Sequence, residues 1–147
     1  MKLLILNGPN LNLLGIREPE LYGTADYAAL VRLIGETCDS CGADYEVYQS
    51  NHEGALVDRI QAACTDHVDG IVLNAAAYSH TSIAILDALK AVRIPTVEVH
   101  LTDIAAREPY RRHSYVSEAA EKVITGHGID GYREAILWLA EFLRGAR

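Results

Sequence analysis

The feature that most constrains the fold is a regular alternation of short apolar runs with longer segments of helical periodicity. Residues 2–7 are almost entirely aliphatic, which is typical of a strand buried on both faces of a parallel sheet. Further strands are predicted at 45–48, 71–73, 96–101 and around 123–124. Helices are predicted at 26–41, from about 54 to just before 69, at 80–92, and from 129 onward.

This alternation predicts an α/β fold. The chain has 147 residues, half of them apolar, which suffices for a single domain, 1–147, with its own core. Five strands alternating with helices are typical of a doubly wound, flavodoxin-like five-stranded parallel sheet. Right-handed crossovers bring the carboxyl ends of such strands to one edge, where ligands bind. The candidate functional residues are therefore those that directly follow each apolar run.

The charge balance excludes several classes of partner. The chain has 13 Lys and Arg against 20 Asp and Glu, a net charge of −7. We expect no nucleic-acid partner and no membrane partner, because both are bound chiefly through clustered Lys and Arg. No apolar run approaches the roughly 20 residues that cross a bilayer. No cleavable signal pattern precedes the first predicted strand, so we expect a cytoplasmic protein.

The three cysteines do not indicate a disulfide framework or a metal site. Cys38 and Cys41 have the spacing of a redox pair. A redox pair lies at the start of a helix, where the thiol pKa is lowered, whereas this one ends a helical segment just before Gly42. We interpret both as unreactive thiols and expect no metal, because no further ligands lie nearby.

Asparagines follow the first strand, at Asn7, Asn10 and Asn12. Next to Gly8 and Pro9 they are also typical of a simple turn, since asparagine tolerates left-handed backbone. Their place at the expected ligand edge makes them candidate ligand-binding residues as well.

Polar residues also follow the third strand. Asn74 precedes three alanines, which allow a ligand to approach, and a polar group that includes His80. Thr81 or Ser82 has the character of a helix N-cap. A lone histidine is more often structural, but His80 at the start of the predicted helix lies on the ligand edge.

The fourth strand carries two ionisable residues on one face. Glu98 and His100 alternate with the apolar Val97, Val99 and Leu101. A buried Glu–His pair can be a purely structural hydrogen bond. It is also how a general acid is held ready near neutral pH.

Arginines cluster downstream of this strand, at Arg107, Arg111 and Arg112 next to His113. One interpretation is a solvated helix face with ion pairs. At this edge of an acidic protein, a clamp for a carboxylate or hydroxyl is the alternative.

The long segment 8–23 shows no convincing period and is interpreted as a functional loop, with a lid at about 13–23. It contains Arg17 and Tyr22. Tyr22 is either a packing residue or a base. Ionising a tyrosine of pKa about 10 at pH 7 costs roughly 4 kcal/mol, and a neighbouring cation can remove much of that.

Taken together, these motifs closely resemble the type II 3-dehydroquinate dehydratases, from Leu4 to about Leu143. The motifs that carry the resemblance are NGPNLNLLG (7–15), REP (17–19), YG (22–23), QSNHEG (49–54), NAAAYSHTS (74–82), VEVH (97–100), ARE (106–108) and RRHSY (111–115). The resemblance implies dehydration of 3-dehydroquinate to 3-dehydroshikimate through an enolate, the third step of the shikimate pathway. It also implies that no cofactor, metal or Schiff base takes part.

The resemblance also implies roles for individual residues. Tyr22 matches the base, Arg17 the cation that lowers its pKa, and Asn10 the holder of an ordered water. His100, paired with Glu98, matches the general acid. Substrate-binding positions are matched by Asn74 and the backbone amides of Leu101 and Thr102 for the carboxylate, by His80 and Arg111 for the ring hydroxyls, and by Arg107, whose role stays open.

Assembly is a further implication. Asp87 matches a residue that reaches a neighbouring subunit's site, in a family that forms homododecamers as tetramers of trimers. Five positions depart from the commoner pattern of the family: Thr102, which keeps the hydroxyl of the usual serine, and Leu86, Asp103, Ala105 and Pro109. Asp103 adds negative charge near the carboxylate loop, and Leu86 removes an intersubunit ion pair, so affinity and assembly are expected to be affected more than chemistry.

The competing interpretation is a non-enzymatic domain that binds flavin phosphate or receives a phosphoryl group. A receiver needs acidic residues after the first strand and an aspartate after the third, where this chain has Asn7 and Asn74. Flavin binding requires a Ser/Thr/Gly-rich phosphate loop, which residues 8–11 do not provide.

Overall fold

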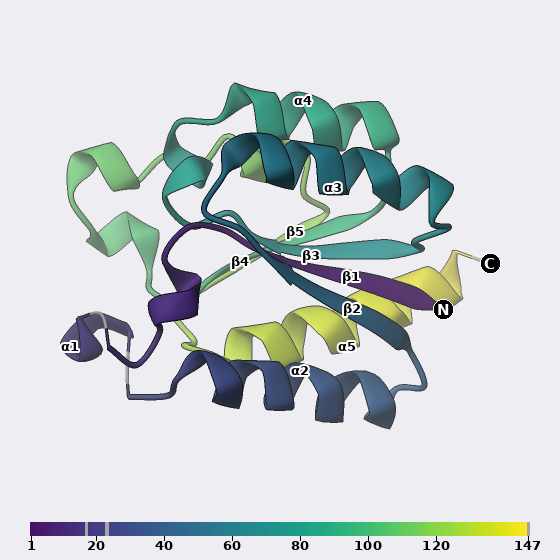
Figure 1. Cartoon of the computed structure of the whole chain (residues 1–147), viewed down its shortest axis with the longest axis horizontal. Helices are drawn as coiled ribbons and strands as arrows, with labels where there is room; N and C mark the ends of the chain where they lie inside the picture. Colours follow the sequence, from purple (N-terminus) through teal and green to yellow (C-terminus); the bar gives the residue numbers. More distant parts are fainter. Residues whose placement is uncertain (17, 23, 147) are drawn as a thin grey trace.

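The structure, a computed structural model, describes residues 1–16, 18–22 and 24–146, without the side chains of residues 19 and 22. All five strands are parallel and form one sheet in the order β2-β1-β3-β4-β5, which confirms the flavodoxin-like prediction (Figure 1). The strands are β1 (Lys2–Asn7), β2 (Asp44–Gln49), β3 (Gly70–Asn74), β4 (Thr96–His100) and β5 (Lys122–Thr125).

Two pairs of helices cover the two faces of the sheet (Figure 1). The helices are α2 (Tyr27–Ser40) and α5 (Asp130–Gly145) on one face, and α3 (Glu53–Thr65) and α4 (Ile83–Val92) on the other. β1 contributes to both cores, because Leu3 and Ile5 pack with the first pair, whereas Leu4 and Leu6 pack with the second. Each such buried side chain contributes about 1.5–3 kcal/mol to stability.

Side-chain caps set the start of two helices. The Asp26 carboxylate accepts the Ala29 N–H at 2.7 Å and begins α2, and the Ser82 hydroxyl accepts the Ile85 N–H at 3.0 Å and begins α4. The predicted helix 80–92 was therefore placed too early. His80 is instead the last residue of a separate 3-10 helix, η2 (Ala76–His80), which follows the carboxyl end of β3.

The segment 8–23 is not the irregular loop that its sequence predicted. It contains η1 (Leu11–Leu13) and the short helix α1 (Pro19–Tyr22), at the end of the molecule where the strands end (Figure 1). Leu11 and Leu14 are buried against the α2 and α5 side of the core. Tertiary contacts thus stabilise η1, which is a single helical turn and is too short to show a helical repeat of apolar residues in the sequence.

The chain between β4 and β5 consists of three 3-10 turns, η3 (Ile104–Ala106), η4 (Pro109–Arg111) and η5 (Val116–Glu118). β4 ends at His100, so Leu101 lies just outside the strand that the sequence predicted. Among the described helices, none is long and apolar enough to cross a membrane.

The cysteines are all free thiols. Cys38 is buried in α2, and burial raises the pKa of its thiol to about 12, which supports the interpretation of an unreactive side chain.

Candidate active site

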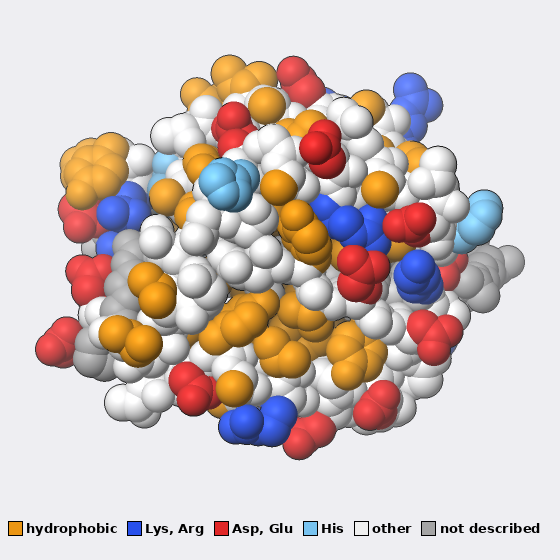
Figure 2. Space-filling view, in the orientation of Figure 1, with side chains coloured by type: hydrophobic (Ala, Val, Ile, Leu, Met, Phe, Trp, Pro, Cys, Tyr) orange, Lys and Arg blue, Asp and Glu red, His pale blue; other side chains and the backbone are white. Residues whose placement is uncertain are grey.

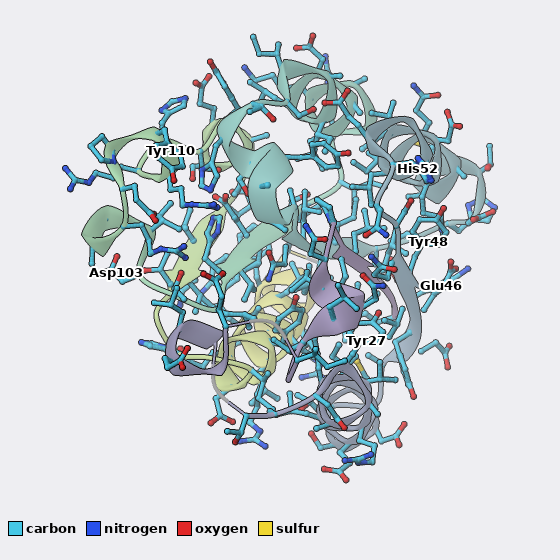
Figure 3. All side chains as sticks on the ribbon, turned by 60° about the vertical axis from the view of Figure 1, so that its left-hand side comes forward. Tyr27, Glu46, Tyr48, His52, Asp103 and Tyr110 are labelled. Atoms are coloured by element: carbon cyan, nitrogen blue, oxygen red, sulfur yellow. The ribbon has the colours of Figure 1, made fainter. Side chains whose placement is uncertain are left out.

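A pocket opens at the carboxyl edge of the sheet, with a volume of about 510 Å³ that includes open solvent. Figure 3 looks onto this edge, with Asp103 and Tyr110 of the segment after β4 on one side and Tyr48 and His52 on the other. Seven of the predicted site residues line the pocket together: Asn74, His80, His100, Leu101, Thr102, Arg107 and Arg111. The other lining residues are Pro9, Leu11, Ala76, Ala77 and Ile104.

Glu98 and His100 form a buried pair at the end of β4. The Nε2 of His100 donates to Glu98 Oε1 at 2.6 Å, and the carboxylate has no exposed surface. Ser114 donates to Oε1 of the same carboxylate and Ser117 to Oε2. Burial alone would raise the pKa of Glu98, but the hydrogen bonds and charge of His100 and the two hydroxyls outweigh it and hold the pKa below its usual value. Glu98 is therefore ionised and accepts hydrogen bonds from His100 and both serines.

His80 is held in one tautomer. Its Nδ1 lies 2.7 Å from the carbonyl oxygen of His113, so Nδ1 carries the proton and Nε2 is left as an acceptor. Burial lowers the pKa of His80, which keeps the ring neutral at pH 7. Its ring stacks on that of His100 with centroids 6.4 Å apart. The pocket is thus lined by two histidines of different character. His80 is neutral and can accept a hydrogen bond, and His100 is paired with the Glu98 carboxylate.

The arginine cluster is not a helix face. Arg107 and Arg111 belong to the turns after β4, line the pocket, and both pair with Glu108 at 3.3 Å. Arg107 also donates to the Thr102 hydroxyl at 3.3 Å. Arg112 donates to the Arg107 carbonyl at 2.9 Å and does not line the pocket. Figure 2 shows Lys and Arg side chains among Asp and Glu side chains at this left-hand end of the molecule.

Two backbone amides and one side-chain amide belong to residues that line the pocket. In the described part of the chain, neither the Leu101 nor the Thr102 N–H donates to another protein group. Asn74 Oδ1 accepts the Ala76 N–H at 3.1 Å, and the Asn74 side chain also hydrogen-bonds the buried Tyr132 hydroxyl, so the side-chain amide is held in place at the pocket wall. With two arginines close by, this arrangement can bind a carboxylate.

The sequence pattern of the family "Dehydroquinase class II" matches residues 1–140. The chain belongs to this family. The assignment fits the pocket, in which a carboxylate-paired imidazole, a set of amide donors and two arginines face one ligand space.

Curated relatives and solved structures agree with the assignment. A 3-dehydroquinate dehydratase of Bradyrhizobium sp. (strain BTAi1) is 59% identical over 136 residues, covering 92% of this chain and 83% of the relative. Catabolic 3-dehydroquinase 1 of Aspergillus terreus is 54% identical over 134 residues, covering 91% and 88%. The crystal structure of a type II dehydroquinase from Butyrivibrio crossotus superposes with a TM-score of 0.93 at 48% identity, covering 95% of this chain and 97% of the other.

Among the described residues expected at a class II dehydroquinase site, Glu98, Asn10 and Asp87 do not line this pocket. Asn10 is the N-cap residue of η1 and has left-handed backbone, with φ 67°. It lies between Pro9 and Leu11, which do line the pocket, and its N–H donates to Asn51 Oδ1 at 3.0 Å. Asp87 is exposed on α4. Arg17 lies outside the described residues, as does the side chain of Tyr22.

A buried polar network beneath the pocket was not predicted. The hydroxyl of Tyr132, on α5, donates to Asn7 Oδ1 at 2.6 Å, and Asn7 Nδ2 donates to the Tyr27 hydroxyl at 3.4 Å. Asn7 pairs in the sheet with Asn74, so the network lies directly behind the amide donors. Asn7 thus serves as a structural support, which the sequence left open between turn and ligand.

Of the residues that depart from the family pattern, Asp103 has a role in the local backbone structure. Asp103 caps η3 by accepting the Ala105 N–H at 3.0 Å, so its carboxylate is used by the backbone. Leu86 is buried in α4, whereas Ala105 and Pro109 are exposed.

Proposed function

We propose that this site dehydrates 3-dehydroquinate to 3-dehydroshikimate without a cofactor, as the third step of the shikimate pathway. The dehydratase activity follows from the family match over residues 1–140 and from relatives with up to 59% identity. The observation that carries the mechanism is the ionised Glu98 bonded to His100 at the wall of a pocket rich in amide donors.

Binding starts with the substrate's carboxylate. The Leu101 and Thr102 N–H groups and the Asn74 amide supply donors, and the nearby arginines supply positive charge. His80 Nε2 is an acceptor, so it suits a ring hydroxyl that donates, whereas Arg111 suits one that accepts. This division of donors and acceptors orients the ring.

The first chemical step is removal of the proton next to the ketone. By its match to the family's motif, Tyr22 is the residue that takes this proton as a phenolate, and Arg17 stabilises the phenolate. Residues 13–23 act as a lid that carries both residues to the pocket, with α1 at the sheet edge. A water held by Asn10 donates to the enolate oxygen that forms.

The second step expels the hydroxyl. The enolate electrons form the new carbon–carbon double bond as the carbon–oxygen bond breaks, and His100 delivers a proton to the departing oxygen. The net loss is one water molecule. Glu98 orients the His100 ring through their hydrogen bond, and Ser114 and Ser117 hold Glu98 in place.

An imine route lacks its nucleophile. The sequence has only three lysines, Lys2, Lys90 and Lys122. Lys2 and Lys122 begin β1 and β5 at the opposite edge of the sheet, and Lys90 pairs with Glu118 at 3.8 Å on the surface.

We further propose a cytoplasmic homo-oligomer, a dodecamer built as a tetramer of trimers, in which Asp87 completes a neighbour's site. Its exposed position on α4, away from its own pocket, supports this role. Co-assembly of Asp87→Ala with Tyr22→Phe subunits should give activity above that of either variant, because some sites then carry neither defect. Mixed oligomers without such a gain would contradict the shared site.

The activity is tested with purified protein, a chelator and 3-dehydroquinate. We expect the ultraviolet absorbance of the conjugated enone to rise. Borohydride added with substrate should leave the protein active, since no imine forms. Borohydride-dependent inactivation would contradict the enolate mechanism.

A further inference from the structure

We propose that the turn at residues 126–128, between β5 and α5, is the positioning element that aims the two backbone amides at the substrate's carboxylate. The inference rests on the proposed function of the Leu101 and Thr102 amides and names what holds them. The turn does not line the pocket, so it acts only through these two peptide groups.

Two successive carbonyls bond to this turn. The His100 carbonyl accepts the Gly126 N–H at 3.2 Å, and the Leu101 carbonyl accepts the Gly128 N–H at 3.0 Å. In a regular strand, successive carbonyls point to opposite sides and bond to different neighbours. Here both point to the same turn, so the chain leaves the sheet ladder at this position.

Peptide planarity converts this anchoring into an orientation. In a trans peptide the C=O and the N–H point in opposite directions. The peptide whose carbonyl belongs to His100 carries the Leu101 N–H, and the next one carries the Thr102 N–H. Because both carbonyls are held toward the turn, both N–H groups point away from it, and both residues line the pocket. Two successive amides that point the same way form an anion-binding concavity.

The turn requires glycine for its conformation and not for space. Gly126 has φ +83° and Gly128 has φ +54°, both in the left-handed region. A Cβ on Gly128 would meet nothing within 4 Å, and one on Gly126 would make ordinary contacts from 3.5 Å with Asp103. Helix α5 fastens the turn, since the Gly131 N–H donates to the Gly128 carbonyl at 3.3 Å.

The test compares residues that differ in tolerance of left-handed backbone. At position 128 we would make three variants: Gly128→Asn, Gly128→Ala and Gly128→Val. Asparagine tolerates the left-handed backbone best, and the β-branched valine disfavours it most. Gly42 supplies a matched control, because it has φ +66° with nothing within 4 Å of its Cβ and lies at the end of α2. The same three substitutions at position 42 impose similar backbone strain away from the pocket.

We expect KM for 3-dehydroquinate to rise in the order Asn, Ala, Val at position 128, by about tenfold or more for Val, with kcat changed about threefold at most. The position 42 variants should lose thermal stability in the same order with KM unchanged. Equal KM values for the Val variants at the two positions, a KM for Gly128→Asn as high as that for Gly128→Val, or a fall in kcat with KM unchanged would each overturn the proposal. The Ala variants supply the comparison if Val prevents folding. A wild-type protein without turnover would instead refute the proposed function.

Discussion

Replacing Glu98 by glutamine separates charge from shape at the general acid. Glu98 is fully buried and accepts from His100, Ser114 and Ser117. A glutamine oxygen can still accept from His100, and a serine hydroxyl can turn to accept from the new NH₂ group. The packing and the number of hydrogen bonds are therefore retained, and the negative charge next to the imidazole is what is lost.

The size of the effect follows from this geometry. A hydrogen bond to a charged group contributes about 1.5–3 kcal/mol, against about 1 kcal/mol for a neutral one. The interaction between His100 and this side chain thus weakens by on the order of 1–2 kcal/mol, which corresponds to a factor of about five to thirty in a rate or equilibrium constant. We expect kcat of Glu98→Gln to fall by a similar factor.

Steady-state rates of enone formation would measure this effect. Ser117→Ala is the matched control, because it removes one hydroxyl donor from the same carboxylate and leaves the charge. Its kcat should fall less than that of Glu98→Gln. A Glu98→Gln enzyme with kcat within twofold of wild type would show that the charge of Glu98 does not assist His100.

Three further outcomes are expected. Tyr22→Phe should lower kcat by several orders of magnitude with the fold and substrate binding retained; near-normal turnover would eliminate Tyr22 as the base. Tyr132→Phe should lower the free energy of unfolding by about 1–3 kcal/mol in urea titrations, because the buried Asn7 oxygen loses its donor; an unchanged midpoint would contradict this. The pKa of Glu98 in the folded protein lies below its ordinary value of 4.5, so the ionised carboxylate stabilises the fold above pH 4.5. This stabilisation is lost as the pH falls through the folded-state pKa. Glu98→Gln should therefore lose less stability on acidification than wild type does.

The elements were predictable where burial imposes a long pattern. The continuous aliphatic run of β1 is covered on both faces, and α2 and α5 each bury one stripe of side chains over three or more turns. The boundary errors occur where short turns meet the sheet edge. His80 was assigned to α4 because η2 and α4 are separated only by Thr81 and Ser82, and sequence spacing does not distinguish one continuous helix from two.

The pocket lining was predictable because topology fixes it. Any polar residue that directly follows β3 or β4 lies at the same edge, and Asn74 and His100 end these strands. The groups that support the site were not predictable in this way. Ser117 holds Glu98 from 19 positions downstream, and Tyr132 reaches Asn7 across 125 positions, distances over which no local pattern signals contact.

In the mechanism we propose, base and acid act separately on one substrate in this pocket. The most direct test of this mechanism is His100→Ala incubated with 3-dehydroquinate in deuterated water and followed by proton NMR. In the His100→Ala variant we expect the proton next to the ketone to exchange with solvent while 3-dehydroshikimate formation is strongly reduced, because the base and the enolate site remain. Loss of exchange together with loss of product, in a variant that still folds and binds substrate, would contradict it.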